Sequence, residues 1–119
     1  MIDHVGISVA NYERARAFYE AALAPLGYTV VVDREGQIGF GRGERAYLWM
    51  SQTANPTRPV HIAIAARSRE EVHAFHRAAL AAGAEDEGAP AVRYDGVSEY
   101  FGASVRDGED RKIEAVYRS

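Results

Sequence analysis

"AFYEAALA" at residues 17–24 and "AFHRAALA" at residues 74–81 share six of eight letters, and the second stretch begins 57 residues after the first. The same spacing separates His4 from His61. Self-similarity at a fixed spacing is typical of a chain built from repeated structural units. The repeat therefore predicts two copies of one folding unit, and this prediction decides the architecture.

A strand pattern with a histidine opens each copy. Residues 3–10 read "DHVGISVA", where branched aliphatic residues alternate with a face of small residues that His4 begins. Residues 60–65 read "VHIAIA" and repeat the alternation, with His61 in the matching place. Such alternation indicates a β-strand with one buried face. Each histidine is therefore expected on the face that points away from the aliphatic core.

A helix pattern follows each strand. Asn11 is suited to cap the first helix, and Gly27 is suited to end it. Ser68 and Glu71 have the spacing of a capping box at the start of the second helix, and Gly83 can end that helix. Both helices have an apolar stripe, which we expect to cover the aliphatic face of the preceding strand.

Three further stretches complete each copy. In the first copy, "YTVVVDR", "QIGFGR" and "RAYLWMS" read as strands separated by turn signals. In the second copy, "SEYFGASV" and "RKIEAVYR" read as strands, whereas "EDEGAPAVRYDG" is loop-like. The order βαβββ occurs twice, which predicts an α+β fold whose sheets bury one face under helices.

The length of 119 residues suits one compact domain with a core of its own. We expect a single domain over residues 1–119. Two prolines and an asparagine in "TANPTRP" indicate a linker at 53–59, between a first module at 1–52 and a second module at 60–119.

Composition excludes several classes of protein. The net charge is −3 and no stripe of Lys and Arg is present, so nucleic acid is not an expected partner. The chain has no cysteine, which excludes disulfides, thiolate nucleophiles and Cys-based zinc sites. No long apolar run or signal pattern is present, so the sequence predicts a cytoplasmic protein without a membrane partner.

The last strand adds a carboxylate to the two histidines. Glu114 alternates with apolar neighbours and so falls on the same kind of face as His4 and His61. If both modules curl around one cleft, the three side chains could meet. Two imidazoles and one carboxylate suit Fe(II), and also Mn, Ni, Co or Zn. The alternative is that both histidines are structural, hydrogen-bonded residues and that Glu114 is a solvated strand residue.

The remaining candidates are weaker. Trp49 and Tyr100 are expected to line a substrate pocket, because large aromatic residues often form the walls of ligand sites. His73 and His76 are three residues apart on the second helix, but no carboxylate accompanies them at ligand spacing. We expect both to be surface residues.

Five stretches, in order along the chain, carry a family resemblance: "MIDHVGISVANYERARAFYEAALAPLGY", "VHIAIAA", "AFHRAALAAGA", "EYFGASV" and "KIEAV". Together they resemble the vicinal oxygen chelate superfamily, which includes glyoxalase I, bleomycin and fosfomycin resistance proteins and extradiol dioxygenases. The resemblance covers essentially the whole chain. It implies paired βαβββ modules that form a U-shaped, barrel-like mixed sheet with helices outside, around a divalent metal. It carries the metal-ligand role onto His4, His61 and Glu114, and a catalytic role onto Glu114.

Two departures from the family pattern limit the chemistry. Glyoxalase I has a fourth ligand on the last strand of its first module, where this chain reads "AYLWMS". The repeat pairs Leu48 with Glu114, or Trp49 if the register slips by one, and neither side chain binds metal. This counts against an ordinary methylglyoxal-glutathione lyase. In addition, "RDGEDRK" before the last strand lacks the proline usual in the family.

The resemblance implies a metal-dependent enzyme of the lyase or dioxygenase type, acting on a small molecule that chelates the ion through vicinal oxygens. One alternative is a protein that sequesters a small molecule without turnover, as bleomycin resistance proteins do. Another is a scaffold with a vestigial site. We expect a homodimer, and the sequence leaves open whether the cleft forms within one chain or across the dimer.

Overall fold

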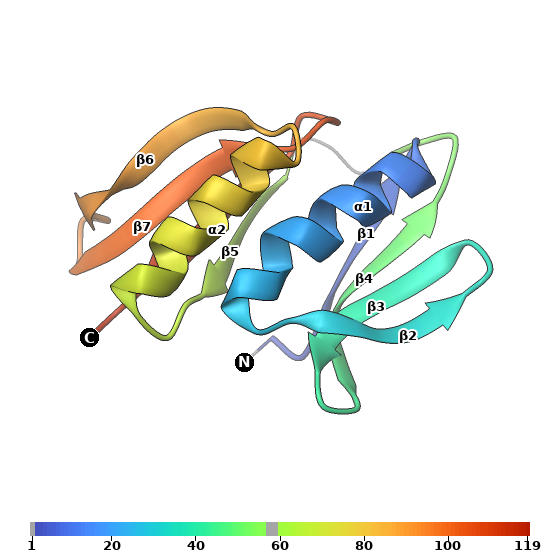
Figure 1. Ribbon diagram of the computed structural model, residues 1–119, viewed down its shortest axis with the longest axis horizontal. Coiled ribbons are helices and arrows are strands. Elements are labelled where there is room, and N and C mark those ends of the chain that lie inside the picture. Colours follow the sequence, from blue (N-terminus) through green and yellow to red (C-terminus); the bar gives the residue numbers. More distant parts are fainter. Residues whose placement is uncertain (1, 57–59) are drawn as a thin grey trace.

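The computed structural model of the protein describes residues 2–56 and 60–119, so residues 57–59 of the expected linker lie outside the described residues. The elements are β1 (Val5–Val9), α1 (Tyr12–Leu23), the 3-10 helix η1 (Ala24–Leu26), β2 (Thr29–Arg34), β3 (Gln37–Arg42), β4 (Arg45–Gln52), β5 (His61–Ala65), α2 (Arg69–Ala81), β6 (Glu85–Tyr94), β7 (Glu99–Arg106) and β8 (Lys112–Tyr117). Figure 1 shows their arrangement. The predicted α+β fold with βαβββ repeated is confirmed.

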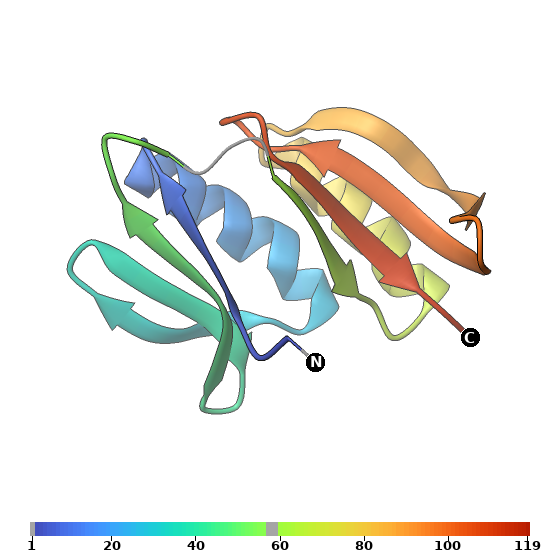
Figure 2. The same cartoon turned by 180° about the vertical axis from the view of Figure 1, so that it is seen from behind.

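The strands form two sheets of matching design. The strand orders are β1-β4-β3-β2 and β5-β8-β7-β6. In each sheet the first strand pairs in parallel with the last strand of its module, and the other pairs are antiparallel. Neither sheet closes on itself within the described residues, and β1 and β5 each lie at an edge. Figure 2 shows both sheets from the side away from the helices, which we call the open face.

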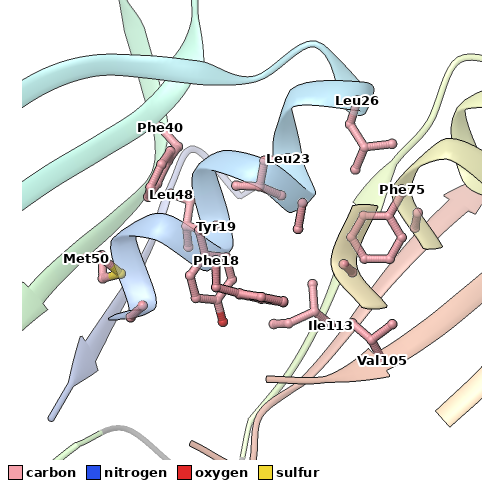
Figure 3. Packing of buried hydrophobic residues seen from close by; sticks show 14 of the residues in the cluster. Phe18, Tyr19, Leu23, Leu26, Phe40, Leu48, Met50, Phe75, Val105 and Ile113 are labelled. Carbon is pink, nitrogen blue, oxygen red and sulfur yellow. The ribbon is translucent and has the colours of Figure 1, made fainter. Parts of the chain in front are cut away.

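One core joins the two modules. Helices α1 and α2 lie side by side on the same side of the sheets (Figure 1). Their inward faces contribute to a single cluster of buried hydrophobic residues, which also includes the helix-facing residues of the strands. Figure 3 shows Leu26 of η1 near Phe75 of α2, with Ile113 and Val105 below them in this view. Burial of this shared apolar surface is what holds the modules together.

The predicted caps are present, with one difference. The Asn11 side chain accepts a hydrogen bond from the Arg14 backbone N–H at 3.2 Å, and Ser68 Oγ accepts one from Glu71 N–H at 3.2 Å. The Glu71 carboxylate accepts from the backbone N–H of Arg67 rather than from that of Ser68. Arg67 also donates to Glu71 through its side chain, and this second contact draws the carboxylate one residue further back.

Two sequence predictions are wrong. The stretch expected to be a loop contains the ten-residue strand β6. Pro90 and two register shifts interrupt the strand pattern in the sequence, but an edge strand tolerates both. His76 is not a surface residue: it is 9% exposed, and its Nε2 lies 3.0 Å from Asp86 Oδ1. His73 is exposed as expected, with its ring 5.4 Å from that of Phe101.

The turn between β7 and β8 ties the second module to the first. We call Asp107, Glu109 and Arg111 the cross-tie. The Glu109 carboxylate accepts from the backbone N–H groups of Ala10 and Asn11 at 2.8 and 2.9 Å. The Arg111 guanidinium is fully buried; it contacts both carboxylates of the cross-tie, and it donates to the backbone carbonyl of Ser8 in β1 at 2.6 Å. The "RDGEDRK" segment is therefore a structural joint between the modules.

No helix in residues 2–56 and 60–119 is both long and apolar enough to cross a membrane.

Candidate metal and ligand site

His61 and Glu114 meet on the open face of the second sheet. They come from the neighbouring parallel strands β5 and β8, in which Ala63 pairs with Glu114. His61 Nε2 lies 3.0 Å from Glu114 Oε1. The Glu114 side chain is only 7% exposed, whereas that of His61 is 53% exposed. A shielded carboxylate beside an accessible imidazole can present both donor atoms to a ligand.

Tyr100 holds the second oxygen of Glu114. This residue lies on β7, and its hydroxyl donates a hydrogen bond to Glu114 Oε2 at 3.3 Å. Burial raises the pKa of Tyr100, and the nearby Glu114 carboxylate raises it further. The hydroxyl therefore stays protonated at neutral pH and remains a donor. Both carboxylate oxygens of Glu114 are thus oriented by side chains of the same sheet.

Tyr100 is in turn packed by the end of β8 and the turn after β6. The Arg118 guanidinium lies 4.9 Å from the centroid of the Tyr100 ring, and Arg118 Nη2 lies 3.0 Å from Asp95 Oδ2. Backbone N–H groups of Ser98 and Val97, together with Arg118, lower the pKa of Asp95 to about 2. Asp95 is therefore ionised at neutral pH, and it fixes the arginine that packs on the tyrosine.

The separation of the two donors suits a shared metal ion. A nitrogen and an oxygen in neighbouring positions of one octahedral ion, each at about 2.1 Å, lie about 3 Å apart. The His61 and Glu114 donor atoms have this spacing, which is also that of the hydrogen bond between them. Among the described residues of one chain, however, no three His, Cys, Asp or Glu side chains lie close enough together to hold a metal. One chain thus supplies two donor atoms at a suitable spacing, and the expected third donor, His4, does not lie close to them.

His4 lies apart from this pair. It precedes β1, in the other sheet, and its Nδ1 lies 2.9 Å from Asp3 Oδ1. Its side chain is 57% exposed, and Arg45 binds the same aspartate. The metal-ligand role of His4 stays a prediction, and it requires the first module to face a second module across an interface.

The strand registers show which residue of the first module matches Glu114. Trp49 pairs with Gly6, and Glu114 pairs with Ala63. Ala63 lies 57 residues after Gly6 and is its equivalent in the repeat. On the other side, Trp49 pairs with Gly39, as Glu114 pairs with Ser104. Of the two pairings that the repeat left open, the registers select Trp49 and not Leu48 as the equivalent of Glu114. Leu48 is buried under the helix, and Trp49 is the equivalent on the open face.

A groove runs beside the donor pair. Its volume is about 340 Å³, and its lining includes Ala63, Ala65, Val116 and Arg118. The groove is not lined by His61 or Glu114 themselves; Ala63, the strand partner of Glu114, is the lining residue next to the pair. Sequence patterns located His61, Glu114 and Tyr100, but they could not show that the tyrosine contacts the glutamate, because this contact depends on the register of β7 and β8.

These features define a two-module α+β protein with an imidazole and carboxylate pair on an open sheet face. The sequence model of the Glyoxalase/Bleomycin resistance protein/Dioxygenase superfamily matches residues 1–114, so the chain belongs to this superfamily. The resemblance found in the sequence is thereby confirmed. No curated protein matches the chain.

Solved structures of the same fold are numerous. A glyoxalase/bleomycin resistance protein from Albidiferax ferrireducens is 28% identical, with a TM-score of 0.86 and 98% of each chain covered. A glyoxalase/bleomycin resistance protein/dioxygenase family enzyme from Burkholderia phytofirmans is 15% identical, with a TM-score of 0.72, covering 98% of this chain and 97% of that one. A glyoxalase-related enzyme from Fulvimarina pelagi is 15% identical, with a TM-score of 0.74, covering 99% and 88%. The last two show likeness of fold alone.

Proposed function

We propose that the protein is a cytoplasmic, divalent-metal-dependent enzyme of the glyoxalase and dioxygenase type, acting on a small molecule with vicinal oxygens. His61 and Glu114 hold the ion, and His4 completes the donor set. The observation that carries this proposal is the 3.0 Å separation of His61 Nε2 and Glu114 Oε1, with the second oxygen of Glu114 already taken by Tyr100.

The side chains of the site have distinct tasks. A bound divalent ion supplies Lewis acidity that stabilises negative charge on ligand oxygens. Glu114 and His61 orient the donors, and Tyr100 fixes the carboxylate by its hydrogen bond. Ala63, the strand partner of Glu114, and Ala65 line a groove that leaves space for the ligand. A positioned outer partner such as Tyr100 is the usual means by which proteins tune a ligating carboxylate.

We further propose that the working site forms in a homodimer, with His4 supplied by a second copy of the chain. Within one chain, His4 and the donor pair belong to separate sheets. Strands β1 and β5 are the edge strands of their sheets, and in Figure 2 they lie nearest each other in the middle of the molecule. The open faces of both sheets, which no helix of the described residues covers, are therefore the surfaces on which a second copy would bring its His4 to the pair.

Metal analysis of untagged protein tests the donor set. We expect stoichiometric metal in the wild type after incubation with Mn²⁺ or Fe²⁺ and desalting, and loss of that metal in His61→Ala. The control is His73→Ala, which removes an exposed histidine of α2. Stoichiometric metal in a folded His61→Ala protein would contradict the site.

Mixing two variants tests whether the site spans two chains. His4→Ala and His61→Ala homodimers each lack a ligand in every site. A mixed dimer regains one intact site if His4 and His61 come from different chains, because the unmodified residues then face each other. Within-chain pairing gives no intact site in any mixture. We expect metal binding to return after unfolding and refolding the two variants together; no recovery would contradict a shared site.

A binding protein without turnover is the second candidate function. The observation that favours it is Trp49, which places an indole where a carboxylate could have supplied acid or base chemistry. It predicts ligand binding that a chelator does not change. A vestigial scaffold predicts neither metal nor ligand binding.

A further inference from the structure

Trp49 lies between two glycines on the open face of the first sheet. It pairs with Gly6 of β1 on one side and with Gly39 of β3 on the other. Leu48 and Met50, its neighbours in β4, point into the core under α1. The indole is therefore the one large side chain in this cross-strand row of three residues.

The two glycines have different relations to the indole. A Cβ at Gly39 would lie 3.2 Å from Trp49 Cζ3 and 3.3 Å from Cε3, so the six-membered ring rests against that glycine. A Cβ at Gly6 would meet nothing within 4 Å. The indole leans toward β3, and the space above Gly6 is open. That space lies over β1, the strand that His4 precedes.

A positive charge accompanies the ring. The Arg34 guanidinium lies 5.8 Å from the centroid of the Trp49 ring, and its Nη1 donates to Gln37 Oε1 at 3.3 Å. A guanidinium near an aromatic platform favours electron-rich rings and rings that bear anionic oxygens. The first module thus offers a flat aromatic surface, an open space beside it and a nearby cation.

We infer that Trp49 is a specificity-determining residue that selects vicinal-oxygen ligands attached to a planar, conjugated ring, which stacks on the indole in the space above Gly6. This inference rests on the proposed function, because it needs the first module to face the His61 and Glu114 pair of a second copy. In that arrangement Trp49 occupies the place on one wall that Glu114 occupies on the other. One wall holds the chelated oxygens and the other selects the ring that carries them.

Two matched ligands test the inference. Mandelate and hexahydromandelate share the same α-hydroxycarboxylate chelating group and the same number of carbons, but only mandelate has a planar ring. We expect the Mn²⁺-loaded wild type to bind mandelate about threefold to tenfold more tightly, the range expected for one aromatic contact. Calorimetry measures both affinities. Trp49 is the only tryptophan, so quenching of its fluorescence reports the contact directly.

Three variants separate stacking from a structural role. Trp49→Leu should bind both ligands with equal affinity, whereas Trp49→Phe should keep most of the preference. Gly6→Val should weaken mandelate binding while Trp49 stays in place, because its side chain enters the open space, where a Cβ meets nothing within 4 Å. Folding of each variant is checked by circular dichroism, and Mn²⁺ content should be unchanged in all three.

The two possible failures are distinguishable. A full preference for mandelate in folded, Mn²⁺-loaded Trp49→Leu would overturn the role of Trp49 and leave the metal site intact. Equal binding of both ligands by the Mn²⁺-loaded wild type would also overturn it. Absence of Mn²⁺ from the wild type would instead refute the proposed function on which the inference rests.

Discussion

Glu114 is the most constrained side chain of the candidate site, because His61 and Tyr100 each hold one of its oxygens. Tyr100→Phe removes only the hydroxyl and keeps the ring against Arg118. We expect Mn²⁺ affinity to fall by about tenfold, since loss of an outer partner of a metal ligand usually costs 10- to 100-fold. A competition titration with a fluorescent chelator measures this change.

Tyr94→Phe is the matched control for this change. Tyr94 ends β6, and it is 68% exposed. Loss of its hydroxyl should leave Mn²⁺ affinity at the wild-type value. Equal affinities in Tyr100→Phe and Tyr94→Phe would show that the hydrogen bond to Glu114 has no part in metal binding.

Sequence patterns find residues of this site better than they find contacts. His61 and Glu114 could be predicted from the sequence. The histidine recurs at the repeat spacing, and the alternation of the last strand places Glu114 on one face. The repeat leaves both Leu48 and Trp49 as possible equivalents of Glu114, because a repeat offset is ambiguous by one residue where loops differ in length. Only hydrogen-bonded register separates the two, since a shift of one residue moves a side chain to the opposite face.

Among the elements, α2 offers the clearest test of a sequence signal. Ser68 Oγ accepts the backbone N–H of Glu71 and so satisfies one free donor of the first turn. Ser68→Ala should lower the free energy of unfolding by about 1 kcal/mol. Ser68→Asp should stay near the wild type, because a carboxylate also accepts this hydrogen bond. Urea denaturation measures both, and equal losses in the two variants would show that capping is not the cause.

The helices were predictable and β6 was not, for a physical reason. A helix cap and a helix stop are local signals, and Asn11, Ser68 and Gly27 act within a few residues of their own positions. Strand β6 exists because β7 pairs with it across two register shifts. That pairing is non-local, so a segment rich in glycine, proline and acidic residues reads as a loop until its partner is known.

At the scale of the molecule, the cross-tie makes the joint between the modules sensitive to acid. Burial raises the pKa of Glu109, but the N–H groups of Ala10 and Asn11 and the charge of Arg111 outweigh it, and the net pKa lies below 4.5. A carboxylate with a lowered pKa in the folded state contributes stability above its unfolded pKa. That stability is lost as the pH falls through the folded pKa.

The free energy of unfolding should therefore decrease as the pH is lowered from about 5 toward 3. Glu109→Gln should be less stable near neutral pH and should show a flatter decrease in this range, because it has no proton to take up. Urea denaturation at several pH values gives both slopes. Glu35→Gln, a change at an exposed turn residue, is the control and should follow the wild type. A Glu109→Gln slope equal to that of the wild type would contradict this role.

The two-module plan was predictable from one repeat, but the placement of the modules was not. Apolar periodicity shows that each helix has a face to bury, without showing that α1 and α2 bury theirs together. The sequence pattern does not predict the buried cross-tie, because a segment with alternating charges is normally a solvated turn. Its burial follows from Arg111 reaching the Ser8 carbonyl in the other module.

The equivalence of Trp49 and Glu114 has a consequence for how such proteins diversify. A duplicated unit starts with the same residue in both halves, and here the two halves carry different chemistry at one shared backbone position. Under the proposed function, substitutions at residue 49 change which ligand binds and leave the proposed metal donors in place, whereas substitutions around residue 114 change the metal site and leave residue 49 in place. Duplication of the module thus lets ligand choice and metal chemistry evolve separately.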